Sequence, residues 1–131
     1  MAKNSIASGN NQSQYQFESS SWIRMIEFLT QENMHMMNRL SEVIDNIHGG
    51  DNLAMAEHYQ NQFIIKDDVY DHMLHDLRRL QGGLRDYPIR NGINKEMQQL
   101  HKNLKEQLEF IERDHILLRQ DYNTYLCSLD D

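Results

Sequence analysis

Residues 93–129, INKEMQQLHKNLKEQLEFIERDHILLRQDYNTYLCSL, decide the fold because their apolar positions keep one helical period over the whole stretch. The stripe takes ten steps to cover 36 residues, which matches the 3.6 residues per turn of a straight α-helix. This pattern predicts one long, unbroken helix. Its core-facing positions are Ile93, Met97, Leu100, Leu104, Leu108, Ile111, His115, Leu118, Tyr122, Tyr125 and Leu129.

Two further helices are predicted on the N-terminal side, each with the same spacing. Ser19 or Ser20 would cap the first helix, which Gly49 and Gly50 would end. Gly82 and Gly83 would end the second, and a connector that contains Pro88 and Gly92 would precede the third. We therefore expect helices over about 19–48, 52–82 and 93–128. The first two stripes are Trp22, Ile26, Leu29, Asn33, Met36, Leu40, Val43 and Ile47, then Ala56, Tyr59, Phe63, Lys66, Tyr70, Met73 and Leu77.

The predicted fold is all-α, with three long antiparallel helices in an up-down-up bundle over residues 18–131. Residues 1–17 are rich in Ser, Asn and Gln without a sustained period, which predicts a disordered tail. Helices of roughly 30 residues would be about 45 Å long at 1.5 Å per residue. Such a thin rod has a small core, so we expect self-association to cover its remaining apolar surface.

Composition excludes several classes of protein. The chain has 131 residues, the size of one small domain, and a formal net charge of -7, which disfavours nucleic acid as a partner. No signal-like start and no apolar run of roughly 20 residues is present, so we expect a cytoplasmic protein without a membrane partner. Cys127 is the only cysteine, so no disulfide can form within the chain. No sequence motif points to a cofactor.

Three polar residues interrupt the apolar stripes near mid-helix: Asn33, Lys66 and His115. A buried polar residue typically costs stability and specifies register or oligomeric state, so we interpret these three as a buried polar layer. Asn33 and Lys66 should meet, with Asp67 or Gln107 as a partner. His115 should lie where Glu57, His58 and Gln62 pass. The alternatives are a small-ligand pocket around Asn33 and Lys66 and a pH-sensitive joint at His115.

Two Glu-x-x-His pairs, Glu32 with His35 and Glu112 with His115, have the spacing of ligands in helical di-iron carboxylate bundles. At 100° per residue, however, His115 faces the core while His35 turns away, so the two histidines should not converge. Asp68, His72 and His75 share one face of the second helix, where they would form a solvated acidic surface or an adventitious divalent-metal site. These residues keep a ferritin-like or hemerythrin-like metal-binding bundle open as the alternative function.

Several apolar side chains fall outside the core stripes on all three helices, which predicts a second, outer contact surface. Basic residues gather around the second connector, at one end of an otherwise acidic rod, where they would stabilise the helix end or dock an acidic partner or phosphate. The outer apolar residues are Phe28, Met34, Ile64, Ile65, Phe110 and Leu117. The basic end comprises Arg78, Arg79, Arg85, Arg90 and Lys95.

The strings WIRMIEFLTQENMHMMNRLSEVI at 22–44, AEHYQNQFIIKDD at 56–68 and DYNTYL at 121–126 carry a resemblance. They resemble small uncharacterised bacterial helical-bundle proteins whose first helix contains the pattern EN…RL.EV. The resemblance covers the three helices but not the tail. It implies a helical fold with Glu32, Asn33 and Arg39 as prominent polar residues, and it implies no activity.

The sequence contains no nucleophile elbow, P-loop, dinucleotide-binding glycine motif, CxxC or HExxH. An enzyme is therefore not the expected class. The function predicted from the sequence is a non-enzymatic interaction or structural module that binds a second copy of itself or another helical protein.

Overall fold

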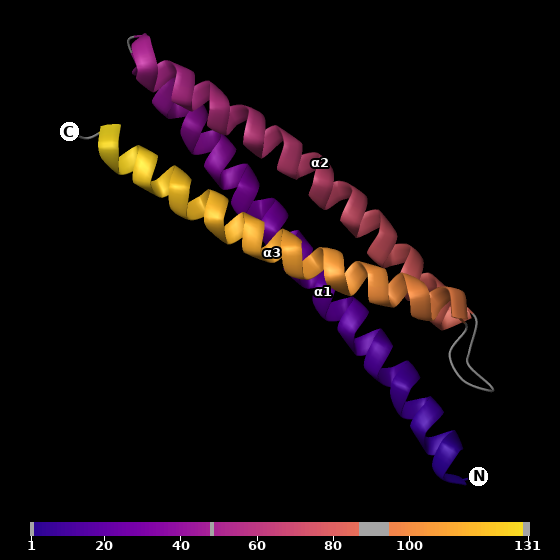
Figure 1. Cartoon of the computed structure of the whole chain (residues 1–131). Helices are drawn as coiled ribbons and strands as arrows, with labels where there is room; N and C mark the ends of the chain where they lie inside the picture. Colours follow the sequence, from indigo (N-terminus) through magenta and orange to yellow (C-terminus); the bar gives the residue numbers. More distant parts are fainter. Residues whose placement is uncertain (1, 48, 87–94, 130–131) are drawn as a thin grey trace.

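The protein is described from a computed structural model, in which three long helices form an up-down-up bundle (Figure 1). The structure describes residues 2–47, 49–86 and 95–129, with side chains from Gln12 onward. The helices are α1 (Ala2–Ile44), α2 (Gly50–Asp86) and α3 (Lys95–Leu129), and the described residues contain no strand. The all-α bundle expected from the sequence is confirmed.

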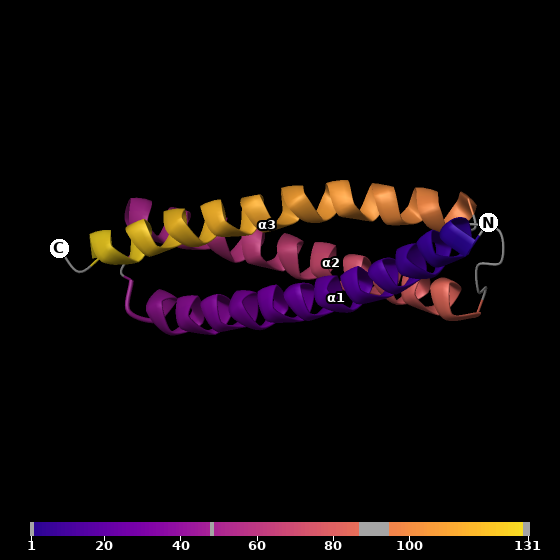
Figure 2. The same cartoon turned by 90° about the horizontal axis from the view of Figure 1, so that it is seen from below.

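The helices do not contact one another equally. α1 packs most extensively against α2, and α3 lies across this pair with its closest approach to α2 (Figures 1 and 2). The C-terminal end of α3 returns to the end of the bundle that holds the α1–α2 turn. Each helix therefore presents an outer face that no other described element covers.

The turn between α1 and α2 matches the glycine pair in the sequence. After Ile44 the chain makes a short turn, in which the Asn46 amide donates to the Val43 carbonyl at 3.0 Å. Gly49 and Gly50 have φ values of 73° and 76°, a left-handed conformation that residues with a Cβ atom rarely adopt. The positive φ angles explain why glycine stands at both positions.

The first helix begins at Ala2 rather than near Ser19, where the sequence analysis placed its start after a tail. Tertiary contacts accompany the extension: Tyr15 stacks on His101 of α3 with ring centroids 3.9 Å apart, and Gln12 Nε2 donates to the Leu84 carbonyl of α2 at 3.1 Å. Ser19 is not an N-cap but a buried residue within the helix, with Oγ donating to the Gln16 carbonyl. Composition cannot show such contacts between helices.

The second helix continues through Gly82 and Gly83 to Asp86, so the predicted end at this glycine pair was wrong. Leu80 and Leu84 extend its buried stripe beyond Leu77. A Cβ atom at position 83 would collide with the Met97 side chain of α3, so this glycine allows close packing between the two helices. Burial of the leucines on either side outweighs the modest helix propensity of glycine.

Candidate functional site

A chain of polar contacts crosses the middle of the bundle and joins all three helices. His115 of α3 is fully buried, and its Nδ1 lies 2.7 Å from the Tyr70 hydroxyl of α2. Its Nε2 lies 2.7 Å from Oε1 of Glu32 on α1, and that oxygen also accepts a hydrogen bond from Arg119 Nη1 at 2.8 Å. Arg119 is one turn after His115, so one face of α3 presents both donors to Glu32.

The electrostatics of this chain favour a fixed protonation pattern. Burial raises the pKa of Glu32, but the hydrogen bonds and charges of His115 and Arg119 outweigh burial and hold that pKa below 4.5. Burial, with the charges of Asp114 and Glu32, raises the pKa of Tyr70 far above its ordinary value of 10. Glu32 therefore stays ionised and Tyr70 keeps its proton, while the direction of the hydrogen bond between the phenol and Nδ1 depends on the tautomer of the His115 ring.

This arrangement satisfies polar groups rather than activating one of them. Both nitrogens of His115 have partners, the phenol of Tyr70 is harder to ionise than usual, and Glu32 is engaged by two donors. A general base or nucleophile needs a free position beside a substrate and a pKa near the working pH. The chemistry supported here is the joining of α1, α2 and α3 at one level of the bundle.

The remaining members of the predicted polar layer occupy separate contacts. Asn33 is fully buried, and its Nδ2 donates to the Phe63 carbonyl at 2.9 Å. Lys66 is half-buried and pairs with Asp114 of α3 at 2.5 Å. The predicted meeting of Asn33 and Lys66 was wrong, because Asn33 faces the backbone of α2 while Lys66 lies on the side of α2 that faces α3.

The predicted partners in this layer also need correction. Asp67 and Gln107 are exposed, and Asp114 is the ion-pair partner of Lys66. The antiparallel register of α2 and α3 brings Tyr70, and not Glu57, His58 or Gln62, beside His115. Neither Tyr70 nor Arg119 was singled out for this role. In the sequence, the only indication of this role was that Arg119 follows His115 by four residues, which places both on the same face of a helix.

The structure separates most of the candidate metal ligands. Within its described residues no group of three His, Cys, Asp or Glu side chains is placed to hold a metal ion. Glu32 and His115 meet, but they come from different Glu-x-x-His pairs, and the other members, His35 and Glu112, are exposed. The sequence prediction that the two histidines turn to different faces agrees with this placement.

The candidate metal ligands on α2, Asp68, His72 and His75, are exposed. The Nδ1 atom of His72 lies 2.9 Å from the Asp68 carbonyl and 3.6 Å from its carboxylate, and His75 is exposed as well. The backbone contact to Asp68, with the charges of Asp68, Asp71 and Asp76, raises the pKa of His72. A raised pKa favours the protonated ring, which cannot bind a metal through either nitrogen.

A groove of about 450 Å³ runs between α2 and α3 on the side away from α1. This groove could not be predicted from the sequence, because a pattern within one helix does not show the space between two helices. Val69 and Phe110 flank it, and both are exposed. The residues that line it are Lys66, Val69, Tyr70, Glu106, Gln107, Phe110, Ile111 and Asp114.

The predicted outer apolar residues are exposed, as the helical wheel indicated. Phe110 is the most exposed of them at 67%, and Phe28 follows at 60%. A large side chain of this kind gains about 1.5–3 kcal/mol when it is fully buried. All six predicted outer residues are exposed, namely Phe28, Met34, Ile64, Ile65, Phe110 and Leu117.

The predicted basic end is only partly within the described residues. Arg78, Arg79 and Lys95 are exposed, and Arg85 Nε lies 3.1 Å from the carboxylate of Asp86. Arg90 lies outside the described residues. The position of Arg85 in the last turn of α2 complements the helix dipole, which accounts for this cation without a partner molecule.

A second cavity, of about 680 Å³, lies beside the α1–α2 turn, at the end of the bundle opposite the basic end. Its polar walls include Arg39, Asn46, Asn52 and Asn123, and Cys127 borders it. This cavity could not be predicted from the sequence, since its walls come from three separate helix ends.

Comparison with known proteins adds no family assignment: no protein-family model matches the chain, and no curated protein or solved structure matches it either. Among the described helices, none combines the length and apolar character that crossing a bilayer requires.

Proposed function

We propose that this protein is a non-enzymatic helical interaction module that self-associates through the outer face of α2 and α3. The observation that carries the proposal is the exposure of large apolar side chains around the α2–α3 groove. Val69 and Phe110 flank that groove directly. Leu117 lies two turns after Phe110, so helical spacing places both on one face of α3. Ile65 is one turn before Val69 on α2 but lines a different pocket, together with Thr30 of α1.

The apolar side chains exposed on this face favour association there. Single exposed apolar side chains are common, but a contiguous patch beside a groove marks contact sites in soluble proteins. Aromatic side chains that fill a pocket on the partner contribute most of the binding energy at many interfaces, and Phe110 is an exposed side chain of this kind. The polar centre of the bundle, where the Tyr70 hydroxyl, both ring nitrogens of His115 and Oε1 of Glu32 have partners, supports a structural rather than a catalytic role.

The test is the mass of the tag-free protein in solution over a concentration series, measured by light scattering and sedimentation. We expect an oligomer that Phe110→Asp and Leu117→Asp shift toward monomer without loss of helicity by circular dichroism. Phe28→Asp is the matched control, because it places the same charge on a phenylalanine of similar exposure on α1. A wild-type monomer at all concentrations, or a mass unchanged by both α3 substitutions, would refute the proposal.

Metal binding is the alternative function, and the meeting of Glu32 with His115 is the observation that favours it. Native mass spectrometry of chelator-washed, tag-free protein reports bound metal and subunit number in one spectrum. Stoichiometric metal that disappears in His115→Ala and Glu32→Ala would favour the metal-binding bundle over the interaction module.

A further inference from the structure

The outer face of α3 carries a short pattern that is complementary to itself. Glu106, Phe110, Arg113 and Leu117 follow at steps of four, three and four, so they lie along one side of the helix. All four are exposed, whereas Leu108, Ile111 and His115 between them are buried. This face is therefore available to a partner over at least three turns.

The two charged members of the pattern are free to pair with another molecule. Neither Glu106 nor Arg113 forms an ion pair within the part of the chain that the structure describes. They bracket Phe110, with the acid four residues before it and the base three residues after it. The charge therefore changes sign across the most exposed apolar side chain of the described surface.

Such a pattern pairs with a copy of itself in one orientation. If a second α3 lies antiparallel, with the two-fold axis midway between positions 106 and 113, beside Phe110, then Glu106 lies opposite Arg113 of the partner subunit, and Arg113 lies opposite the partner's Glu106. A two-fold axis repeats each contact, so one pattern supplies two ion pairs. A parallel arrangement in register would instead place like charges opposite each other, which opposes association.

We infer that the partner at the α2–α3 face is a second copy of this chain, docked with its α3 antiparallel and with the two-fold axis midway between Glu106 and Arg113, beside Phe110. The α2–α3 groove next to Phe110 accepts the phenylalanine of the other copy, since Val69 and Ile111 give it apolar walls. This inference rests on the proposed function and names the partner and its orientation.

The decisive experiment is a charge-swap cycle measured by sedimentation equilibrium. Glu106→Arg and Arg113→Glu each place two like-charged pairs across the interface, and we expect each to weaken the dimer by roughly tenfold. The double variant E106R/R113E restores opposite charges in reversed order, so we expect its dissociation constant to return to within a few fold of wild type.

Disulfide formation provides an independent measurement, because its result does not depend on how the charge substitutions affect the helix. In a Cys127→Ser background, an oxidised equimolar mixture of Glu106→Cys and Arg113→Cys chains should form a mixed disulfide dimer. Each single variant alone should not, because its two cysteines are separated along the antiparallel helices beyond the reach of a disulfide, about 7 Å between Cα atoms.

The possible results separate the two proposals. A wild-type protein that is monomeric overturns the proposed function and this inference together. A wild-type dimer in which the charge swap fails to restore association, or in which the mixture gives no mixed disulfide, overturns the antiparallel docking alone. Circular dichroism of each variant checks that helicity is retained.

Discussion

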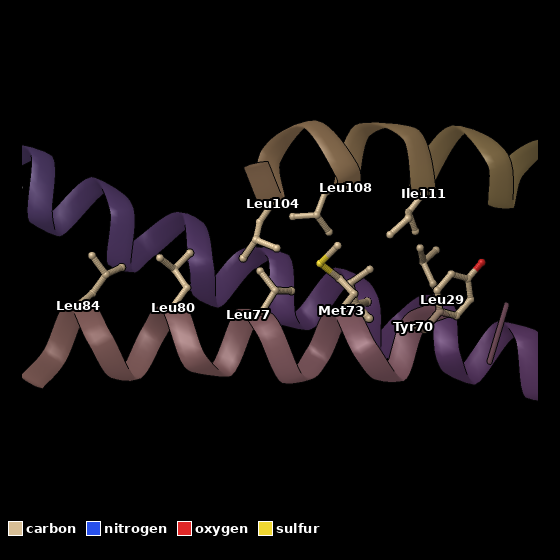
Figure 3. Close-up of a cluster of buried hydrophobic side chains, with 10 residues drawn as sticks. Leu29, Tyr70, Met73, Leu77, Leu80, Leu84, Leu104, Leu108 and Ile111 are labelled. Carbon is tan, nitrogen blue, oxygen red and sulfur yellow. The ribbon is translucent and has the colours of Figure 1, made fainter. Parts of the chain in front are cut away.

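The two halves of the bundle are packed with different side chains. Near the C-terminal end of α2, the core consists mainly of aliphatic residues, and Leu77, Leu80 and Leu84 project from α2 in a row (Figure 3). Near the α1–α2 turn, the core is mainly aromatic, with Tyr59 and Tyr122 only 5.6 Å apart between ring centroids. The polar contacts of His115 lie between these halves.

In the aromatic half, the core tyrosines make directional contacts that the leucines of the aliphatic half cannot make. Tyr122 donates its hydroxyl hydrogen to the Met36 carbonyl of α1, and Tyr125 donates to the Asn52 carbonyl of α2 at 2.8 Å. Tyr59 of α2 donates to the Asp121 carbonyl of α3 at 3.2 Å. Apolar burial is non-directional, so leucines supply stability, whereas these hydroxyls also specify how the helix ends align.

The largest expected effect belongs to the aliphatic half. Leu77 is fully buried, so Leu77→Ala removes apolar contacts and leaves a cavity, which should lower the free energy of unfolding by about 2–5 kcal/mol. The measurement is urea denaturation at one fixed protein concentration. Met34→Ala, at an exposed methionine of α1 outside the proposed α2–α3 interface, is the control and should change stability by about 0.5 kcal/mol or less. Equal losses in both variants would contradict a core dominated by the leucine row.

The boundary between the halves should show the next largest effect. Tyr70→Phe removes the hydroxyl that contacts His115 Nδ1 and leaves a buried ring nitrogen without this partner, which should cost about 1–3 kcal/mol. In the background His115→Leu, the same substitution should cost much less, because no nitrogen remains to be satisfied. A double-mutant cycle by urea denaturation measures this coupling, and additive losses would show that the two groups do not interact.

A smaller effect is expected in the aromatic half. Tyr125→Phe keeps the ring but removes the hydrogen bond to the Asn52 carbonyl, so the loss in unfolding free energy should be about 0.5–1.5 kcal/mol. Hydrogen exchange of the first turn of α2 should increase in the variant relative to wild type. Unchanged stability and exchange would mean that the tyrosine hydroxyls do not hold the helix ends.

The smallest expected effect is a decrease in stability at low pH. We expect it from the aliphatic half, which contains His101, and not from the aromatic half. Burial, with the charge of Lys105, lowers the pKa of His101 in spite of the nearby Glu18 carboxylate, 3.5 Å away. The unfolded chain then binds a proton before the folded one, so stability should decrease as pH falls below 6.5 toward the lower pKa of the folded state.

The matched variant for this pH dependence is His101→Phe, which keeps an aromatic ring beside Tyr15 and Trp22. Unfolding free energy measured between pH 7 and pH 5 should fall less in this variant than in wild type. In the aromatic half, burial raises the pKa of Tyr122 to about 12, so its hydroxyl contact should not titrate in this range. A decline of the same size in both proteins would exclude His101 as the source.

The helical spacing was sufficient to predict much of the buried core. The stripes predicted for α1 and α2 identified Ile26, Leu40, Phe63 and Leu77 as core, and the wheel identified Phe110 as exposed. The prediction of a break at Gly49 was confirmed by its positive φ. These features depend on the 3.6-residue period and on local backbone chemistry, which the order of residues in one helix already specifies.

The partners of the polar residues were decided by the tertiary structure. That Asn33 and His115 are buried followed from their stripes, but their contacts with Phe63, Tyr70 and Glu32 depend on how far one helix slides along another. The extent of α1 and the passage of α2 through its second glycine pair also depend on contacts between helices. Local periodicity determines the face on which a side chain lies, whereas axial register is set by the packing of the whole core.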